Sequence, residues 1–157
     1  MPVVWRLTPT DFAHLLDGEG SRFAGGRWNS PGKAVLYTSS HLSLSVLEAL
    51  VHLPPPLRRD LPEMEAVRIA VPDDAIAEDI SIDRFRRLMA GSEPLAVCRA
   101  AGDAWLERGT ALLLRAPSVV VSEELNLMIN PAHGRMREVR IVSSRRFSFD
   151  PRMAHPA

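Results

Sequence analysis

The chain has 157 residues, of which 46% are hydrophobic and 24% charged, proportions that are ordinary for a single globular domain. Its 19 basic residues balance its 19 acidic ones, so it lacks the strongly positive field of a dedicated nucleic-acid-binding protein, and small molecules or proteins are the expected partners. The N-terminus lacks a signal-peptide layout and no apolar run is long enough to span a bilayer, so we expect a cytoplasmic protein that does not enter a membrane.

Short elements of both kinds follow one another irregularly along the chain. Strands are predicted at residues 3–7, 34–38, 65–71, 110–115, 118–121 and 138–142, with 147–149 as a candidate for a last one. Helices are predicted from a start at 8–11 through 12–16, from Ser39 or Ser40 to about residue 53, and at 94–108. Residues 18–32 read as an irregular loop, and 83–89 are ambiguous. Strands outnumber helices and do not alternate regularly with them, which favours a mixed α+β domain over a doubly wound parallel sheet.

The predicted helix that ends near residue 53 has a narrow polar arc. Apolar side chains cover most of its circumference at helical spacing, and only His41, Ser45, Glu48 and His52 remain on the polar side. Such a helix is expected to pack on several sides, so that its polar arc faces either a strip of solvent or a cleft. An exposed stripe is the ordinary arrangement for a lone glutamate, but the segment upstream favours the cleft.

That upstream segment is Gly25-Gly26-Arg27-Trp28-Asn29. Paired glycines let a backbone approach a ligand closely, and an arginine there can fork onto phosphate oxygens. A tight turn with a solvated arginine would explain the same residues. The glycine pair is neither a Walker loop nor a dinucleotide fingerprint, because the required lysine or third glycine is absent. However, Arg27, Tyr37 and Glu48 follow at near-equal intervals in a loop, a strand and a helix. Together they suit a ligand with an anionic pyrophosphate, a flat aromatic ring and a sugar that develops positive charge.

The combined pattern resembles the RES-domain family, the toxin half of bacterial RES–Xre toxin–antitoxin modules. The resemblance covers nearly the whole chain and rests on residues 5–6, 25–29, 36–39, 47–52, 117–121, 126 and 129–133. It implies one α+β domain with a mixed sheet over residues 1–150, of the ADP-ribosyltransferase (diphtheria-toxin-like) fold, followed by a flexible tail at 151–157.

The resemblance also implies an activity. RES proteins consume NAD as a substrate, without a metal, either transferring ADP-ribose to a host protein or degrading NAD by hydrolysis or phosphorolysis. A cognate Xre-like antitoxin is the implied partner, and no direct contact with nucleic acid or membrane is expected. A module with the same fold that binds a nucleotide or a protein without turnover is the alternative.

Carried over position by position, the family's essential residues are Arg27, Tyr37, Glu48, Ser118 and Arg6, with Ser122 as an alternative to the nearby Ser118. Cleavage of the nicotinamide–ribose bond passes through an oxocarbenium-like sugar, which a carboxylate bonded to a ring hydroxyl stabilises, so Glu48 is the candidate. Tyr37 would hold the nicotinamide ring. The two arginines would hold the pyrophosphate, and the serine would bond the ribose or orient the glutamate.

Other patterns have simpler explanations. Glu48 and His52 lie four residues apart on one helical face, with His41 two turns back. No clear third ligand stands at a matching spacing, so a metal site is disfavoured. Arginines cluster at positions 84, 86 and 87 and again between 135 and 146. Solvated surface is the default explanation and binding of an acidic partner the second. RNA binding ranks third, because few aromatic residues lie among these arginines. Cys98, the single cysteine, is expected to be a small buried residue and not a nucleophile.

Overall fold

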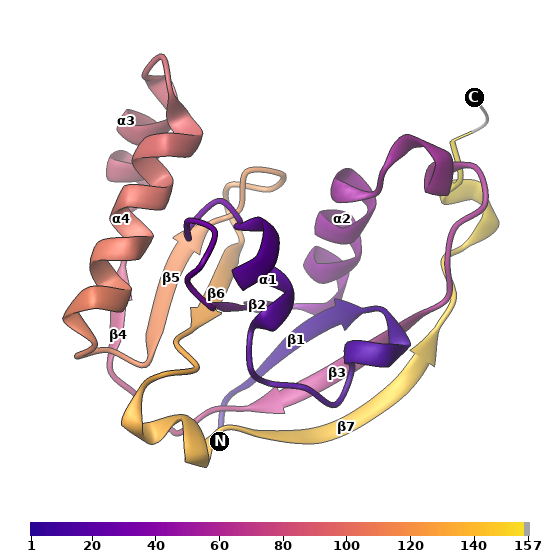
Figure 1. Ribbon diagram of the computed structural model, residues 1–157. Helices are drawn as coiled ribbons and strands as arrows, with labels where there is room; N and C mark the ends of the chain where they lie inside the picture. Colours follow the sequence, from indigo (N-terminus) through magenta and orange to yellow (C-terminus); the bar gives the residue numbers. More distant parts are fainter. Residues whose placement is uncertain (156–157) are drawn as a thin grey trace.

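One seven-stranded sheet runs through the molecule in the order β4–β5–β6–β2–β1–β3–β7 (Figure 1). The computed structural model describes residues 1–155. The strands are β1 (Val3–Thr8), β2 (Leu36–Ser39), β3 (Met64–Ala70), β4 (Ala77–Asp79), β5 (Leu113–Pro117), β6 (Leu125–Ile129) and β7 (Arg140–Phe147). Neighbouring strands are antiparallel except β4 and β5, which are parallel. The predicted α+β fold with a mixed sheet is confirmed.

Four α-helices and four short 3₁₀ helices complete the fold. The α-helices are α1 (Glu19–Ala24), α2 (Leu42–His52), α3 (Ile82–Ala90) and α4 (Pro94–Arg108). The 3₁₀ helices are Thr10–Phe12, Pro55–Arg58, Gly134–Glu138 and Pro151–Met153. No helix within residues 1–155 is long and apolar enough to cross a membrane.

The sheet is weakest at its centre. β1 and β2 share a single register pair, Trp5 with Ser39, whereas β1 pairs with β3 at six positions and β2 pairs with β6 at four. The sheet therefore divides into a half built from β4, β5, β6 and β2 and a half built from β1, β3 and β7 (Figure 1). Helix α2 ties the halves together, because the Ser45 hydroxyl donates to the Trp5 carbonyl at 3.0 Å.

Helix α4 covers one half of the sheet with a dense apolar contact. Its Cys98 and Trp105 are fully buried and pack with Leu114 of β5 and Met128 of β6. The Trp105 indole donates to the Ala111 carbonyl at 3.1 Å, so its one polar atom is satisfied. Burial also raises the pKa of the Cys98 thiol, which agrees with the prediction that this cysteine is a buried residue and not a nucleophile.

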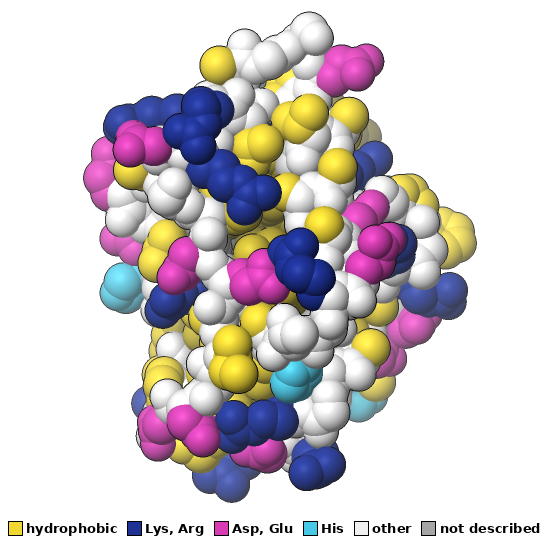
Figure 2. All heavy atoms as spheres, turned by 90° about the vertical axis from the view of Figure 1, so that its left-hand side faces the viewer, with side chains coloured by type: hydrophobic (Ala, Val, Ile, Leu, Met, Phe, Trp, Pro, Cys, Tyr) yellow, Lys and Arg dark blue, Asp and Glu magenta, His cyan; other side chains and the backbone are white. Residues whose placement is uncertain are grey.

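The surface over α3, α4 and β4 carries charges of both signs (Figure 2). The acidic side chains of β4 are paired with neighbouring elements, since Asp79 pairs with Arg115 of β5 at 2.6 Å and Glu78 pairs with Arg108 of α4. The predicted basic cluster on α3, Arg84, Arg86 and Arg87, is exposed throughout, as expected for solvated surface.

Three predicted elements before residue 55 differ from the structure. Residues 12–16 do not form a helix. The 3₁₀ helix ends at Phe12, and Arg6 Nη1 donates hydrogen bonds to the Phe12 and Leu15 carbonyls at 3.2 and 2.7 Å, in place of helical backbone donors. The predicted loop 18–32 contains α1, bounded by Gly18 and Gly25 at φ 68° and 75°. The glycines of this segment lower its helix propensity, so the sequence pattern did not predict the helix. Helix α2 has His41 at its N-cap, without side-chain capping, in place of Ser39 or Ser40.

The largest error lies after β5. Residues 118–121 were predicted to be a strand because of their valines, but the Ser118 hydroxyl accepts from the Val120 and Val121 amides at 3.0 and 3.2 Å and turns the backbone into a loop. The strand is β6, at Leu125–Ile129, which the prediction left out together with the three-residue β4.

The C-terminal part also differs in detail. The ambiguous residues 83–89 lie in α3, and the strand predicted at 138–142 is the longer β7, which takes in Phe147 of the candidate last strand. Strand β7 is an edge strand with mostly exposed polar positions, so its apolar alternation is weak. Within the predicted tail, Pro151–Met153 form a 3₁₀ turn and the His155 amide donates to the Arg58 carbonyl at 2.7 Å, while the flexibility of the tail stays a prediction. Residues 156–157 of that tail lie outside the described residues.

Candidate active site

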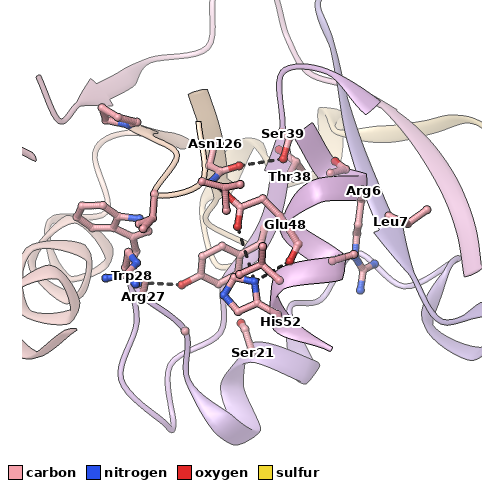
Figure 3. Close-up of a pocket in the computed structure, with 18 of the residues that line it drawn as sticks. Arg6, Leu7, Ser21, Arg27, Trp28, Thr38, Ser39, Glu48, His52 and Asn126 are labelled. Atoms are coloured by element: carbon pink, nitrogen blue, oxygen red, sulfur yellow. Dashed lines mark hydrogen bonds and ion pairs between the residues drawn. The ribbon is translucent and has the colours of Figure 1, made fainter. Parts of the chain in front are cut away.

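A cavity of about 350 Å³ opens where β1 and β2 separate (Figure 3). Strand β1, the loop after α1, strand β2, helix α2 and the segments around β5 and β6 all contribute to its wall. The charged and titratable side chains that line it, among the described residues, are Arg6, Arg27, Tyr37, Glu48 and His52. Four of the five predicted site residues line this cavity, namely Arg6, Arg27, Tyr37 and Glu48.

Glu48 has one carboxylate oxygen fully engaged by protein donors. Its Oε1 accepts from the Ser118 hydroxyl at 2.6 Å and from Asn126 Nδ2 at 2.7 Å. No hydrogen bond reaches Oε2 within residues 1–155, and His52 Nδ1 lies 3.7 Å from it. The carboxylate is therefore anchored on one side and free to accept a hydrogen bond from a ligand on the other.

The polar arc of α2 thus faces the cleft, as the upstream segment indicated, since Ser45, Glu48 and His52 all line the cavity. The expectation that α2 packs on several sides was wrong on its outer surface. Leu47 and Val51 are 38% and 53% exposed. The apolar circumference of the helix reflects contact with the central strands β1 and β2 and with the cavity wall, and not complete enclosure.

Ser118 lies behind Glu48 and is completely buried. Because its oxygen already accepts two backbone amides, its single proton is left for Glu48. Ser122, the alternative, is exposed and its nearest polar partner is Glu123 at 3.4 Å.

The position of Asn126 was included in the resemblance, but its contact with Glu48 was not anticipated, and Ser39 was missed as its support. Ser39 Oγ donates to Asn126 Oδ1 at 2.9 Å, and Asn126 in turn contacts Glu48 (Figure 3). The two residues are direct register partners between β2 and β6. A signal for this contact would have required the register of β6, an element absent from the prediction.

Tyr37 connects the strand to the arginine loop. Its hydroxyl accepts from the Trp28 amide at 3.0 Å and donates to Asn29 Oδ1 at 2.6 Å, so it holds the backbone next to Arg27. Gly26 passes so close that a Cβ there would lie 2.5 Å from the Tyr37 hydroxyl. The aromatic ring lines the cavity while the hydroxyl is committed to the loop.

We expect Tyr37 to stay un-ionised in the folded protein well above its ordinary range. Burial raises its pKa, and the Trp28 amide, Arg99 and Arg27 offset this only in part. Between an unfolded pKa of about 10 and the higher folded value, only the unfolded state ionises, so the free energy of unfolding falls as pH rises through that window.

Tyr37 is the single tyrosine of the chain, so tyrosinate absorbance during an alkaline titration reports on it alone. The signal should appear together with the loss of circular dichroism, whereas protein unfolded in guanidinium should titrate near pH of about 10. A tyrosinate signal near that pH in protein that keeps its circular dichroism would show that the hydroxyl is not held as described.

Arg27 reaches from the loop toward the α3–α4 hairpin. Its Nη1 lies 3.5 Å from Met89 Sδ, and within residues 1–155 it forms no ion pair. Helix α4 supports the loop from behind, because Arg99 Nε donates to the Gly26 carbonyl at 2.8 Å and Gly102 lies against the Trp28 carbonyl. Neither α4 residue was anticipated from the sequence.

Arg6 lies on the other side of Glu48 from Arg27 (Figure 3). Its Nη1 is held by the Phe12 and Leu15 carbonyls. Burial lowers the pKa of Arg6, and the charge of Asp17 partly offsets this effect. A ligand laid across the cavity would thus meet a guanidinium on each side.

The arrangement gives little support to metal binding. No group of three or more His, Cys, Asp or Glu side chains suited to a metal ion occurs in the described part of the chain. His41 Nδ1 pairs with Glu124 Oε2 at 2.7 Å, and His52 Nδ1 bonds to the Glu48 carbonyl at 2.7 Å.

The chain is similar to known proteins along nearly its whole length. A family model described as the RES domain matches residues 3–150. The Prs ADP-ribosylating toxin of Sphingobium sp. (strain YBL2) is 36% identical over 161 residues, covering 98% of this chain and 97% of that protein. The Toxin Res of Yersinia enterocolitica serotype O:8 / biotype 1B is 35% identical over 137 residues, covering 87% and 88%.

A solved structure supports the same fold. The crystal structure of the M. tuberculosis MbcT–MbcA toxin–antitoxin complex contains a chain that superposes with a TM-score of 0.72 at 17% identity, covering 93% of this chain and 84% of that one. The predicted resemblance to the ADP-ribosyltransferase-like fold of these toxins is thereby confirmed. With a family match over residues 3–150 and relatives above 30% identity along nearly the whole length, the chain belongs to the RES-domain family.

Proposed function

We propose that this chain is the toxin of a toxin–antitoxin pair and that it breaks the nicotinamide–ribose bond of NAD in the cavity beside Glu48. The observation that carries the proposal is the carboxylate itself. Glu48 is the single acidic side chain that lines the cavity among the described residues, and one of its oxygens is anchored by two donors while the other remains available.

The chemistry follows from that arrangement. When the bond between C1′ and the nicotinamide nitrogen breaks, its electron pair goes to the nitrogen, which neutralises the pyridinium, and the sugar becomes oxocarbenium-like. Glu48 Oε2 would accept a hydrogen bond from a ribose hydroxyl and stabilise that charge. A nucleophile then bonds to C1′ and loses a proton.

The other site residues would bind NAD and orient it and the Glu48 carboxylate. The sequence assigned both Arg27 and Arg6 to the pyrophosphate, but the two lie on opposite sides of Glu48 (Figure 3). Arg27 would hold the pyrophosphate, since a guanidinium group pairs with phosphate oxygens through two parallel hydrogen bonds, and Arg6 would contact the ligand from the other side. The Tyr37 ring would lie against the nicotinamide, and its hydroxyl would keep the Arg27 loop in place. Ser118 would act through Glu48 and not on the sugar, because its hydroxyl already donates its hydrogen bond to the carboxylate.

Two acceptors of the ADP-ribose are chemically open. Transfer to a side chain of a host protein is favoured by the 36% identical relative, whose name describes an ADP-ribosylating toxin. Hydrolysis or phosphorolysis of NAD is the second use of the same cleavage. In either case the producing cell needs a partner that silences the site. We propose an antitoxin, because the structural neighbour is a toxin–antitoxin complex, and the resemblance to RES–Xre modules makes an Xre-like protein the candidate.

The test of this proposal is nicotinamide release. Purified protein is incubated with NAD and with extract of a susceptible cell, and free nicotinamide and protein-bound ADP-ribose are quantified by mass spectrometry. Release of nicotinamide supports the proposal, and the ratio of the two products identifies the acceptor. Tight binding of NAD without any release would instead support a non-catalytic binding module.

A matched pair of serine variants distinguishes the two candidate serines. Ser118→Ala removes a donor from Glu48 and leaves the Val120 and Val121 amides without their partner, so we expect nicotinamide release to fall about tenfold to a hundredfold, the loss typical of one hydrogen bond to a charged group. Ser122→Ala, four residues away and exposed, should change the rate less than about twofold. Equal effects of the two substitutions would remove Ser118 from the site.

A further inference from the structure

We propose that Asn126, held by Ser39, is the positioning residue that keeps Glu48 oriented, and that the site requires its side-chain amide to donate a hydrogen bond. The inference rests on the proposed function for its kinetic consequences. Its structural content, a fixed orientation of the Asn126 amide between Ser39 and Glu48, is independent of any activity.

The hydrogen-bond pattern allows one orientation of the amide. An ionised carboxylate is an acceptor only, so Asn126 must direct Nδ2 toward Glu48 Oε1, at 2.7 Å. Its Oδ1 then faces Ser39, whose hydroxyl donates at 2.9 Å. Without Ser39 the amide could rotate and place Oδ1 against the carboxylate, which would be repulsive.

The three residues sit on rigid elements. Ser39 and Asn126 are opposite each other in the β2–β6 ladder, and Asn126 is also paired with Ala116 of β5. Ser39 is buried and Asn126 is half-buried in the cavity wall. The sheet register therefore sets where the Asn126 amide lies, and side-chain motion contributes little to its position.

The charges around Glu48 make this donor important. The titratable and charged groups that share the cavity with it, among the described residues, are His52 of α2, Arg6 of β1, Tyr37 of β2 and Arg27 of the loop after α1. From β6 and the loop after β5, the uncharged Asn126 and Ser118 donate hydrogen bonds to the carboxylate. These two donors hold Oε1 in place while leaving Oε2 available to the ribose.

Asn126→Asp converts this arrangement into a pH-sensitive one. The aspartate has nearly the same shape, and in its protonated form its hydroxyl can donate to Glu48 Oε1 while its carbonyl accepts from Ser39, as the amide does. Once that proton is lost, two carboxylates lie at hydrogen-bonding distance and repel each other. The variant should therefore work at low pH and lose activity as pH rises.

The kinetic experiment compares pH profiles of nicotinamide release. Asn126→Ala should lower kcat about tenfold to a hundredfold at every pH with KM for NAD changed less than about threefold, as expected for the loss of one donor to a charged group. Asn126→Asp should approach the parent at acidic pH and show an alkaline decline that the parent lacks. Ser122→Asp, which adds the same charge on the exposed neighbouring loop, is the control and should keep the parent profile. Asn126→Asp with the parent's profile at all pH values would overturn the proposal.

A second measurement does not depend on turnover. In the folded protein, the Asn126 side-chain amide protons are followed by NMR, with their assignment taken from the signals lost in Asn126→Asp. We expect one proton to be shifted downfield by the carboxylate, to move in Glu48→Gln, and to broaden or exchange in Ser39→Ala. Signals unchanged in both variants would refute the fixed amide, whereas a parent protein that fails to cleave NAD would refute the proposed function alone.

Discussion

Glu48→Gln is expected to reduce nicotinamide release by a hundredfold or more while the protein still folds and binds NAD. The glutamine carbonyl can still accept from Ser118 and Asn126, so the anchored side of the residue is preserved. Its amide then occupies the position of Oε2, where a donor replaces an acceptor and the negative charge is gone. Loss of one such transition-state interaction corresponds to about 3 kcal/mol of activation free energy.

The measurement combines kcat from a nicotinamide assay with an NAD dissociation constant from calorimetry. Glu124→Gln is a suitable control, because Glu124 is a neighbouring carboxylate that pairs with His41 and does not line the cavity. A Glu48→Gln enzyme with parental kcat would exclude the carboxylate from the mechanism. A variant that lost NAD binding instead would place Glu48 in ground-state recognition.

Gly102→Ala is the substitution expected to disrupt the site from farthest away. A Cβ at Gly102 would lie 1.7 Å from the Trp28 carbonyl oxygen and 2.5 Å from its carbon, and both are backbone atoms. Either α4 or the loop that carries Arg27 must move. Alanine favours a helix over glycine by about 1 kcal/mol, but overpacking of this kind costs about 1–3 kcal/mol, and the displaced arginine should raise KM for NAD.

For a domain of this size each kcal/mol corresponds to about 2–4 °C in melting temperature, so calorimetry and steady-state kinetics on Gly102→Ala both have measurable readouts. Gly20→Ala in α1 is the matched control, since a Cβ there meets no atom within 4 Å, and it should leave Tm unchanged or higher. If the two variants had the same Tm and KM, the close contact between α4 and the loop would not support the site.

Three candidate site residues that line the cavity could be predicted from the sequence. Glu48 could be identified because it interrupts an apolar helix. Arg27 and Tyr37 could be identified because they precede it at near-equal intervals, in a glycine-containing loop and a strand. The structure places all three on one cavity. The mixed α+β class could also be predicted, because strands outnumber helices without alternating with them.

The supporting residues could not be found in the same way. Asn126 depends on the pairing of β6 with β2, and the valines of the preceding loop matched a strand better than β6 itself did. Gly102 looks like any glycine that weakens a helix, and only its distance from the Trp28 carbonyl shows why the position must lack a side chain. Both cases depend on contacts between segments far apart in sequence, which local patterns do not encode.

In the proposed mechanism, NAD lies across this cavity with its nicotinamide ribose beside Glu48. A crystal structure of the Glu48→Gln protein soaked with NAD tests it most directly, because slow turnover should preserve the intact dinucleotide. We predict a ribose hydroxyl at a hydrogen-bonding distance of about 3 Å from residue 48, the nicotinamide ring against Tyr37 and the pyrophosphate at Arg27. NAD bound with its nicotinamide ribose away from residue 48, or bound outside the cavity, would contradict the account.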